Sequence, residues 1–195
     1  DKLNISDEVK HEKGYTNVAL FGLDSRENDL GKGNRSDTII IASLNNDTKE
    51  VKLVSIYRDT LLELDDGSYN KANSAYSFGG PEGAVSLINR NLDMNIEKYV
   101  TVNFNALVDV IDAVGGLDLE LTHDEVVHMN NYCVETSKVT GKSYEKIEPE
   151  VEGTYHLNGV QAVSYSRIRY TEGGDFKRAE RQRLVLQKIA DKAQN

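Results

Sequence analysis

Short apolar runs, rich in β-branched residues, recur in the first half of the chain and restrict the folds that it can adopt. Residues 17–22, 38–42 and 51–56 hold three such runs, and each is too short for an ordinary helix. Their continuous apolar character, without alternation, is typical of strands in a sheet that is covered on both faces. Asn45-Asn46-Asp47 separates the last two runs and is a turn signal, so these two are predicted to form a hairpin.

Segments with helical spacing alternate with further strands. Pro81 is typical of a first helical residue, and the apolar spacing after it predicts a helix as far as Leu92. The pattern then predicts strands at 99–103 and 117–121, helices at 104–115, 157–165 and 175–190, and irregular or mobile structure over the polar residues 124–150. The fold class predicted is therefore α/β: an α-β-α sandwich with a mixed central sheet flanked by helices.

The length fits one domain. The chain has 195 residues, of which 38% are hydrophobic, so one folded domain is predicted over residues 15–195. Residues 1–14 are polar and charged, and we predict a flexible arm there.

No apolar run is long enough to span a membrane, and no signal peptide is present. Because the chain opens at Asp1 rather than Met, we expect it to be part of a longer protein.

Charge is distributed unevenly along the chain. The formal net charge of −9 argues against a protein that binds nucleic acid, which needs a basic surface to neutralise phosphates. Residues 167–188 nevertheless carry seven basic and three acidic side chains. An acidic protein that concentrates its arginines in one segment is predicted to bind a small anionic ligand.

Several common catalytic motifs are absent from the sequence. The four histidines are scattered, Cys133 is the only cysteine, and there is no HExxH, CxxC, Gly-x-Ser-x-Gly or Walker A pattern. Zinc, thiol and serine-nucleophile chemistry are therefore disfavoured. Acidic and arginine side chains remain, and these are the groups that phosphoryl transfer requires.

Two aspartates lie at strand boundaries. Asp24 follows the first predicted strand and Asp37 opens the second, so the two carboxylates can meet at one edge of a sheet. Oxygen ligands of this kind suit Mg2+, with Mn2+ as the alternative ion, while substrate phosphate and water fill the remaining positions. Aspartates at strand ends are also common without any metal, so the spacing alone leaves both interpretations open.

Basic side chains accompany these aspartates. Arg35 stands two residues before Asp37, Arg58 follows at another predicted strand end, and Lys71 can add a point charge. Arginine offers a planar fork for bidentate contact with phosphate. Arg167 and Arg169 share one side if their segment is extended, and a helix places Arg178, Arg181 and Gln182 on one face. The alternative is a surface ion-pair network with Glu172, Asp175 and Glu180.

Taken together, these motifs resemble the LytR-CpsA-Psr family, an extracytoplasmic group of cell-wall phosphotransferases. The resemblance covers most of residues 17–190, with seven segments in the family's order. The matching segments are NVALFGLDSR (17–26), GNRSDTIIIASL (33–44), VKLVSIYRDT (51–60), YNKANSAYSFGGPEGAV (69–85), VTVNFNALVDVIDAVGGLDL (100–119), YHLNGVQAVSYSRIR (155–169) and GGDFKRAERQRLVL (173–186).

The resemblance implies an activity and a set of partners. The chain would move a glycopolymer, such as wall teichoic acid or capsular polysaccharide, from polyprenyl pyrophosphate onto peptidoglycan and release polyprenyl phosphate. A sugar hydroxyl would attack the phosphate nearer the glycan, and a carboxylate, Asp37 or Asp175, would take its proton. The family is usually tethered to the bacterial cell membrane by an N-terminal helix, with this domain outside the cytoplasm.

The resemblance also implies a role for each matching residue. Asp24 and Asp37 would bind the metal, and Asp37, Arg58 and Asp175 would be catalytic. The pyrophosphate would be held by Arg35, Arg58, Lys71, Arg167, Arg169, Arg178, Arg181 and Gln182. An apolar tunnel for the lipid would be lined by Val85, Ile88, Phe104, Leu107, Val108 and Ile111, although the same residue types also build an ordinary core.

Two positions depart from the family pattern. Tyr57 stands where the family usually has Pro, and Ser74 stands where a His is common, so a mechanism that needs that His is in doubt here. Two other functions stay open: a pyrophosphatase that uses water as acceptor, and a binding module that holds lipid-linked glycan without catalysis.

Overall fold

A computed structural model describes residues 2–9, 13–23 and 30–193. Its contacts divide the chain into two compact units, Asp1–Asn103 and Phe104–Asn195, and each unit has its own hydrophobic core. The single domain predicted for residues 15–195 stays a prediction.

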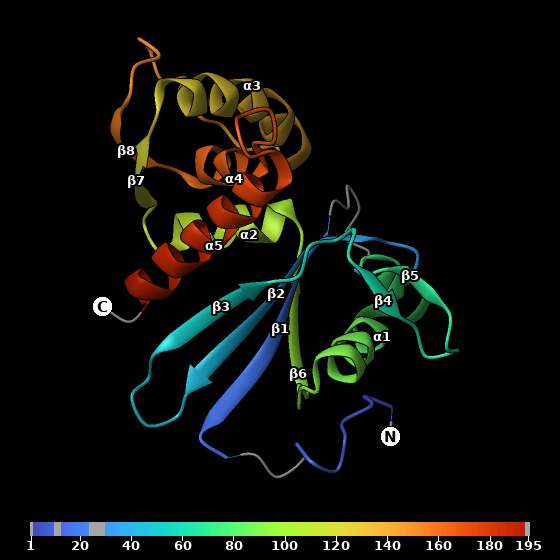
Figure 1. Cartoon of the computed structure of the whole chain (residues 1–195). Coiled ribbons are helices and arrows are strands. Elements are labelled where there is room, and N and C mark those ends of the chain that lie inside the picture. Colours follow the sequence, from blue (N-terminus) through green and yellow to red (C-terminus); the bar gives the residue numbers. More distant parts are fainter. Residues whose placement is uncertain (1, 10–12, 24–29, 194–195) are drawn as a thin grey trace. The chain divides into compact units, whose positions relative to one another are not determined.

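A four-stranded sheet forms the centre of the first unit (Figure 1). β1 (Tyr15–Leu23), β2 (Ser36–Asn45), β3 (Val51–Ser55) and β6 (Lys98–Val102) lie in the order β3-β2-β1-β6. β2 pairs antiparallel with both β1 and β3, whereas β1 and β6 are parallel. The predicted hairpin is confirmed, and its turn is fixed by the Asn45 side chain, whose Oδ1 accepts from the amides of Asp47 (2.9 Å) and Thr48 (3.0 Å). The α/β class with a mixed central sheet is confirmed as well.

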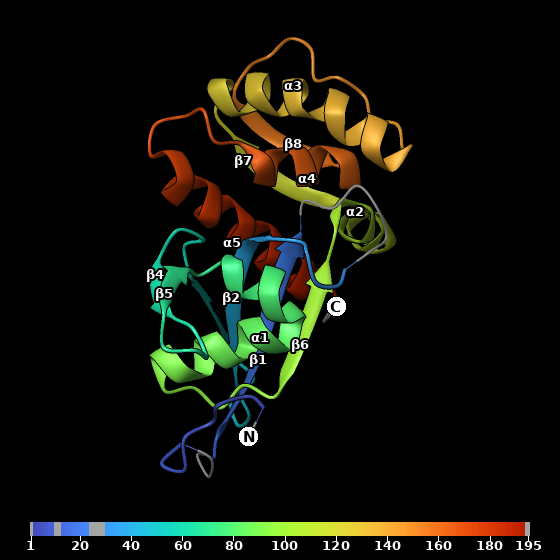
Figure 2. The same ribbon diagram turned by 90° about the vertical axis from the view of Figure 1, so that its right-hand side faces the viewer.

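One face of this sheet packs against α1 (Ser74–Leu92), as the views in Figures 1 and 2 show. Phe21 lies on this face, and its ring meets that of Tyr76 edge-on with 5.3 Å between the centroids. Val85 and Ile88 of α1 are completely buried in the same core. These two residues were predicted to line a lipid tunnel, and the structure places them in the packing between helix and sheet.

The opposite face of the sheet is also apolar. Leu20 of β1 is paired with Ile40 of β2 and with Val100 of β6, so the three side chains share one face. Side-chain alternation adds Val18, Ala42 and Leu53 to that face. Val100 is 49% exposed.

α1 begins earlier than predicted. Its first turns start at Ser74, and Gly80 then interrupts the helix with φ 65° before Pro81 starts the longer segment. Pro81 lacks an amide hydrogen and so suits the first turn after the break, which explains why the sequence pattern indicated a start there. The hairpin β4 (Leu61–Glu63) and β5 (Tyr69–Lys71) packs beside α1.

Part of the predicted arm contacts the first unit. The side-chain amide of Asn4 donates to Ser86 Oγ at 2.7 Å and to Asp65 Oδ1 at 2.8 Å. The Leu3 carbonyl accepts from Asn89 at 2.8 Å, and the Leu3 side chain packs against the core. The flexibility predicted for residues 1–14 stays a prediction.

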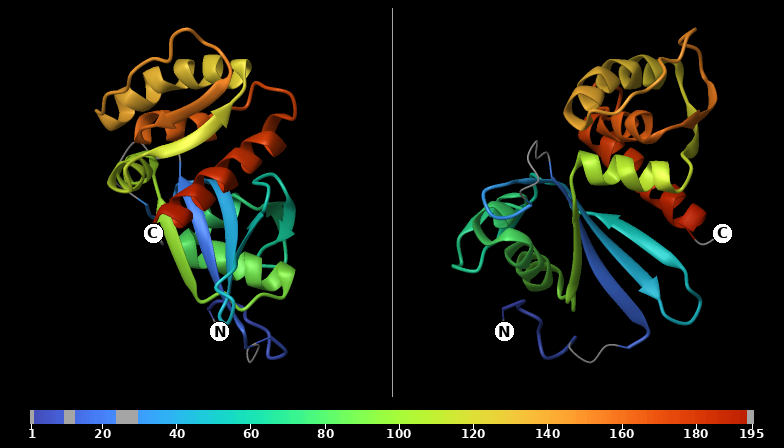
Figure 3. Two further views of the ribbon diagram at one scale, coloured as in Figure 1. Left: turned by 90° about the vertical axis from the view of Figure 1, so that its left-hand side faces the viewer. Right: turned by 180° about the vertical axis from the view of Figure 1, so that it is seen from behind.

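The second unit is mainly helical (Figure 3). It consists of α2 (Phe104–Ala113), β7 (Leu117–Leu121), α3 (His123–Thr140), β8 (Gly153–Leu157), α4 (Gly159–Arg167) and α5 (Gly174–Ala193). β7 and β8 pair antiparallel, and α4 contacts α2, α3 and α5. Val108 and Ile111, also predicted for the tunnel, are completely buried in this unit's core, and Phe104 and Leu107 pack partly buried against it.

The prediction of irregular structure at 124–150 was wrong for most of that stretch. α3 begins with a capping box in which Thr122 and Glu125 bond each other's backbone amides. The buried face of the helix includes the polar residues Asn130 and Thr136 as well as Glu125, which hides the apolar periodicity. Residues 141–152 contain neither helix nor strand.

Within the described ranges, no helix is both long and apolar enough to cross a bilayer.

Candidate functional site

A polar cavity of about 350 Å³, called the cation-lined cavity below, lies in the first unit. It gathers four of the residues predicted to bind pyrophosphate or metal, together with two further polar side chains. Its lining is Arg35, Asp37, Arg58, Asp59, Lys71 and Asn73. Three cations and two carboxylates thus surround one cavity, and this composition suits an anionic ligand that brings a divalent cation with it.

Ion pairs set the geometry of this cavity. Arg58 Nη1 donates to Asp37 Oδ1 at 2.7 Å, and Arg58 Nε lies 3.8 Å from Asp59 Oδ2. Lys71 Nζ lies 2.7 Å from Asp59 Oδ1. The Arg58 side chain is 22% exposed and that of Lys71 is 60% exposed, so both cations remain open to solvent. A phosphate group can therefore approach them from the cavity.

Backbone hydrogen bonds bring the distant segments of this site together. The Asn73 amide donates to the Arg58 carbonyl at 3.1 Å, and the Ala72 amide donates to the Thr60 carbonyl at 2.8 Å. These bonds fasten the start of α1 to the turn after β3. As a result Arg58 and Lys71, which belong to different strand ends, face the same cavity.

Asp37 is the described member of the predicted metal pair, and Asp24 lies outside the described residues. Mg2+ commonly takes one or two protein carboxylates and completes its shell with substrate phosphate and water. Asp37 and Asp59, in an open polar cavity, fit that pattern. Among residues 2–9, 13–23 and 30–193, no three His, Cys, Asp or Glu side chains cluster as a metal site.

A second group of arginines belongs to the second unit. Arg178 Nη2 lies 2.7 Å from Asp175 Oδ1, and Arg169 Nε lies 3.7 Å from the same oxygen. Burial raises the pKa of the Tyr132 phenol, and Arg167, Arg169 and Arg178 each act to lower it. The charges of these three cations therefore act on the same phenol.

Arg167 ends α4, so the condition of an extended segment, under which Arg167 and Arg169 would share one side, is not met at Arg167. Its guanidinium carbon lies 4.4 Å from the centre of the Phe104 ring and 5.3 Å from that of Tyr132. Its Nη1 donates to Thr136 at 3.1 Å and its Nη2 to Glu135 at 3.0 Å. Ile168, whose side chain is completely buried, follows Arg167 as the C-cap of the helix.

Arg181 serves the interior of the second unit. Its Nε donates to Glu125 at 2.9 Å, its Nη1 to the Ile168 carbonyl at 3.3 Å and its Nη2 to Thr171 at 2.8 Å. The side chain is 3% exposed. A guanidinium that is buried and bonded through all three nitrogens favours a structural role over the pyrophosphate contact predicted for it. Gln182, the next residue on α5, is half-buried.

Sequence reasoning gave no role to several residues of these two groups. Asp59 and Asn73 line the cavity of the first unit, and Glu125 neutralises Arg181 in the second. Asp59 directly follows Arg58 at a strand end, which was a usable signal. The Thr122-x-x-Glu125 capping pattern could have indicated a helix start, but nothing in it points to the distant Arg181.

Comparisons with known proteins find relatives in both sequence and fold. The teichoic acid transferase TagV of Bacillus subtilis (strain 168) is 36% identical over 197 residues, covering 98% of this chain and 47% of TagV. The solved structure of TagT bound to LI-WTA is 28% identical with a TM-score of 0.75, covering 97% of this chain and 70% of that one. The family protein YwtF (TagT) with bound octaprenyl pyrophosphate lipid is 27% identical with a TM-score of 0.72, covering 98% and 71%.

The chain spans about half the length of the curated relatives that it matches. The LytR_cpsA_psr family itself matches residues 1–195, and its solved members share the fold described above. This chain therefore belongs to the LytR-CpsA-Psr family.

Proposed function

We propose that this chain is the catalytic part of a phosphotransferase that moves a glycopolymer from polyprenyl pyrophosphate onto peptidoglycan. The observation that carries the proposal is the cavity in which Arg35, Arg58 and Lys71 surround Asp37 and Asp59. Relatives named as polyisoprenyl-teichoic acid–peptidoglycan teichoic acid transferases support the reaction. A neighbour with octaprenyl pyrophosphate bound supports the donor.

In this proposal the three cations bind and orient the diphosphate. Arg58 is held by Asp37 on one side, so its guanidinium is already positioned before the donor arrives. Lys71 adds a point charge, and Arg35 contributes a second guanidinium at the cavity. When bound, Mg2+ or Mn2+ would offset the negative charge of the phosphates, with Asp37 and Asp59 as the described carboxylates available to it.

The transfer follows from that placement. A sugar hydroxyl of the acceptor attacks the phosphorus nearer the glycan, the bond from that phosphorus to the bridging oxygen breaks, and polyprenyl phosphate leaves. The hydroxyl proton passes to a carboxylate, for which Asp37 is the candidate in this cavity, and the catalytic role of Asp175 stays a prediction. The pyrophosphate contacts of Arg167, Arg169, Arg178 and Gln182 stay predictions.

The polyprenyl chain needs an apolar surface. Phe104 and Leu107 are the partly buried members of the predicted tunnel, while the other four residues pack in the two cores. The apolar sheet face that carries Leu20, Leu53 and Val100 is an additional candidate that the sequence did not indicate. We also propose that the longer protein is anchored in the cell membrane, with this part outside the cytoplasm.

Incubation with a lipid-linked teichoic acid donor and peptidoglycan fragments tests the proposed reaction. The wild type should form a glycan–peptidoglycan product and release polyprenyl phosphate in the presence of Mg2+. Asp37→Asn should abolish turnover while leaving the melting temperature nearly unchanged. Lys52→Ala, at an exposed position of β3, is the control. Normal turnover by Asp37→Asn would remove Asp37 from the mechanism.

The same assay separates the alternative functions. Release of polyprenyl phosphate without a peptidoglycan product, in the presence of acceptor, would indicate a pyrophosphatase. Donor binding without either product would indicate a binding module.

A further inference from the structure

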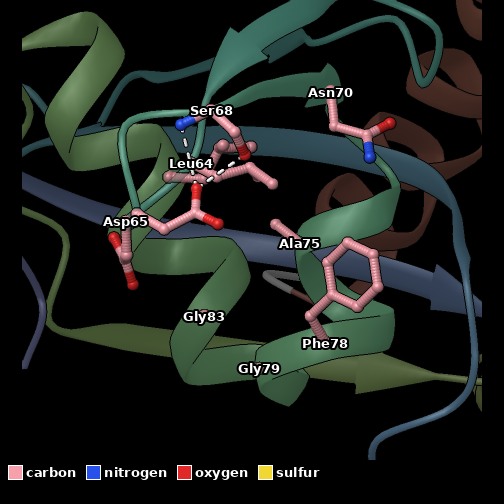
Figure 4. A pocket seen from close by; sticks show the side chains of 10 residues that line it. Leu64, Asp65, Ser68, Asn70, Ala75, Phe78, Gly79 and Gly83 are labelled. Carbon is pink, nitrogen blue, oxygen red and sulfur yellow. Dashed lines mark hydrogen bonds between the residues drawn. The ribbon is translucent and has the colours of Figure 1, made fainter.

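A second cavity in the first unit, of about 510 Å³, has no role in the proposed chemistry. It lies between the β4–β5 hairpin and α1, as Figure 4 shows, with Leu64, Ser68 and Asn70 on the hairpin side. Ala75, Phe78, Gly79 and Gly83 contribute the helix side (Figure 4). Its volume is within the range of about 300–1,000 Å³ that is usual for ligand sites.

The helix side of this cavity is open and apolar. The Phe78 ring is 64% exposed although it is large and hydrophobic. A Cβ atom added at Gly79 would meet no atom within 4 Å, so this part of the helix leaves empty space for a ligand. Leu87, which is 2% exposed, closes the bottom of the cavity.

The hairpin side is polar and negatively charged. Asp65 and Asp66 both line the cavity, and none of its described lining residues is Lys or Arg. Asp65 Oδ1 lies 3.5 Å from Arg90 Nη2, so the negative charge of this side rests mainly on Asp66. Asp66 Oδ1 accepts from the amide (2.9 Å) and the hydroxyl (2.6 Å) of Ser68, and these bonds lower the pKa of the Asp66 carboxyl. The Asn70 side-chain oxygen accepts from the Lys71 amide at 2.8 Å, which orients its amide group.

This chemistry discriminates between ligand classes. Carboxylates repel phosphate and other anions, so the ligand of this cavity differs in charge from that of the cation-lined cavity. Carboxylate and amide groups bond well to hydroxyls, and an exposed aromatic ring packs against the C–H face of a pyranose. A sugar presents both kinds of surface on one ring.

We propose that the cavity between the β4–β5 hairpin and α1 binds a segment of uncharged or amino-bearing oligosaccharide. One pyranose ring packs on Phe78, while its hydroxyls donate to Asp66 and accept from the Asn70 amide. The saccharide-binding site is inferred from these residues alone. The inference that its ligand is the acceptor glycan rests on the proposed function.

The position of the hairpin fits that assignment. Asn70 lines the saccharide cavity and Lys71, the next residue of β5, lines the cation-lined cavity. Neighbouring residues in a strand point to opposite faces, so the hairpin separates the two cavities and contributes to both. The start of α1 is likewise shared, since Asn73 lines one cavity and Ala75 the other.

Isothermal titration calorimetry with three tetrasaccharides tests the proposal. They are the uncharged N-acetylglucosamine tetramer, its deacetylated cationic form and a uronate-bearing anionic tetramer. The wild type should bind the uncharged or the cationic tetramer and not the anionic one. Gly79→Leu fills the cavity and should lower the affinity at least about tenfold, and Phe78→Ala should lower it about tenfold. Because Phe78 is exposed, its removal leaves no internal void, and thermal melting of both variants verifies folding.

Matched controls sit on the same elements. Tyr69→Ala removes an exposed aromatic ring of the hairpin, and Glu82→Leu adds an apolar side chain on α1, both outside the cavity lining. Both should bind saccharide like the wild type. Binding of the anionic tetramer only, absence of binding by all three tetramers, or wild-type affinity in folded Gly79→Leu would overturn the proposal.

Arg58→Ala separates this inference from the proposed function. It should weaken binding of polyprenyl pyrophosphate and leave saccharide affinity unchanged. Unchanged pyrophosphate binding in Arg58→Ala would count against the proposed function and not against the saccharide site. A loss of saccharide affinity in that variant would contradict the separation of the two cavities.

Discussion

Two groups of basic side chains, one in each unit, look alike in sequence and differ in structure. In the first unit, Arg58 and Lys71 line an open cavity and share the Asp59 carboxylate, and Arg58 is also paired with Asp37. In the second unit, the Arg181 side chain is 3% exposed, and its Nε lies 2.9 Å from Glu125. Burial therefore distinguishes Arg58 and Lys71, which can meet a ligand, from Arg181, which completes the protein's own structure.

The difference follows from what surrounds each charge. A buried guanidinium must be paired and bonded, because leaving it without partners in the interior costs several kcal/mol. Arg181 satisfies this requirement with Glu125, Ile168 and Thr171. Arg58 is half-buried and can exchange water for phosphate, so its charge is available for binding.

The largest expected effect is on the buried pair. Arg181→Ala should lower the free energy of unfolding by about 3–5 kcal/mol, because it leaves the Glu125 carboxylate buried without its partner. Urea denaturation measures this, with Arg35→Ala, at the exposed cavity, expected to change stability by less than about 0.5 kcal/mol. The double variant Glu125→Leu/Arg181→Met should recover most of the loss. A small effect of Arg181→Ala would show that the pair is not structural.

The next effect concerns ligand affinity. Arg58→Ala should weaken binding of polyprenyl pyrophosphate by about 10- to 100-fold, since it removes charge-assisted hydrogen bonds to phosphate. Its stability should change by less than about 1 kcal/mol, because the pair with Asp37 is partly exposed. Arg58→Lys should restore only part of the affinity. Equal affinity of all three proteins would move the pyrophosphate site away from this cavity.

A smaller effect is expected at Arg167, which packs against aromatic rings and is also predicted to bind pyrophosphate. Arg167→Lys keeps the charge and loses the planar group that lies over Phe104 and Tyr132, so stability should fall by about 0.5–2 kcal/mol. A double-mutant cycle with Phe104→Leu isolates the ring contact. A coupling near zero would leave Arg167 as a cation held for ligand binding rather than for packing.

The smallest effect belongs to an exposed pair of the second unit. Asp118 Oδ1 lies 2.7 Å from His156 Nδ1, and that hydrogen bond lowers the pKa of the Asp118 carboxyl below its ordinary 3.8. A depressed carboxyl pKa adds stability above the unfolded value and loses it as pH falls through the folded one. Asp118→Asn should therefore melt slightly below the wild type at pH 5, and the difference should shrink as the pH falls below 3.8. A difference that grew with acid would contradict the assignment.

The sequence by itself determined the elements whose pattern is local. The hairpin of β2 and β3, the α/β class and the family all follow from short apolar runs and motifs in order. Four of the six residues that line the cation-lined cavity were also predicted, because charged side chains near strand ends can be recognised from the sequence. α3 escaped prediction because polar side chains occupy much of its buried face.

Only the tertiary structure decided which charges are buried. Their spacing places Arg178, Arg181 and Gln182 on one face of a helix. Arg181 nevertheless bonds to Glu125, a residue 56 positions away. The tertiary structure also assigned Val85, Ile88, Val108 and Ile111 to two cores and revealed a cavity beside Phe78. The physical reason is that spacing fixes the face of a helix or strand on which a residue lies, whereas partners and solvent exposure depend on segments that meet only after folding.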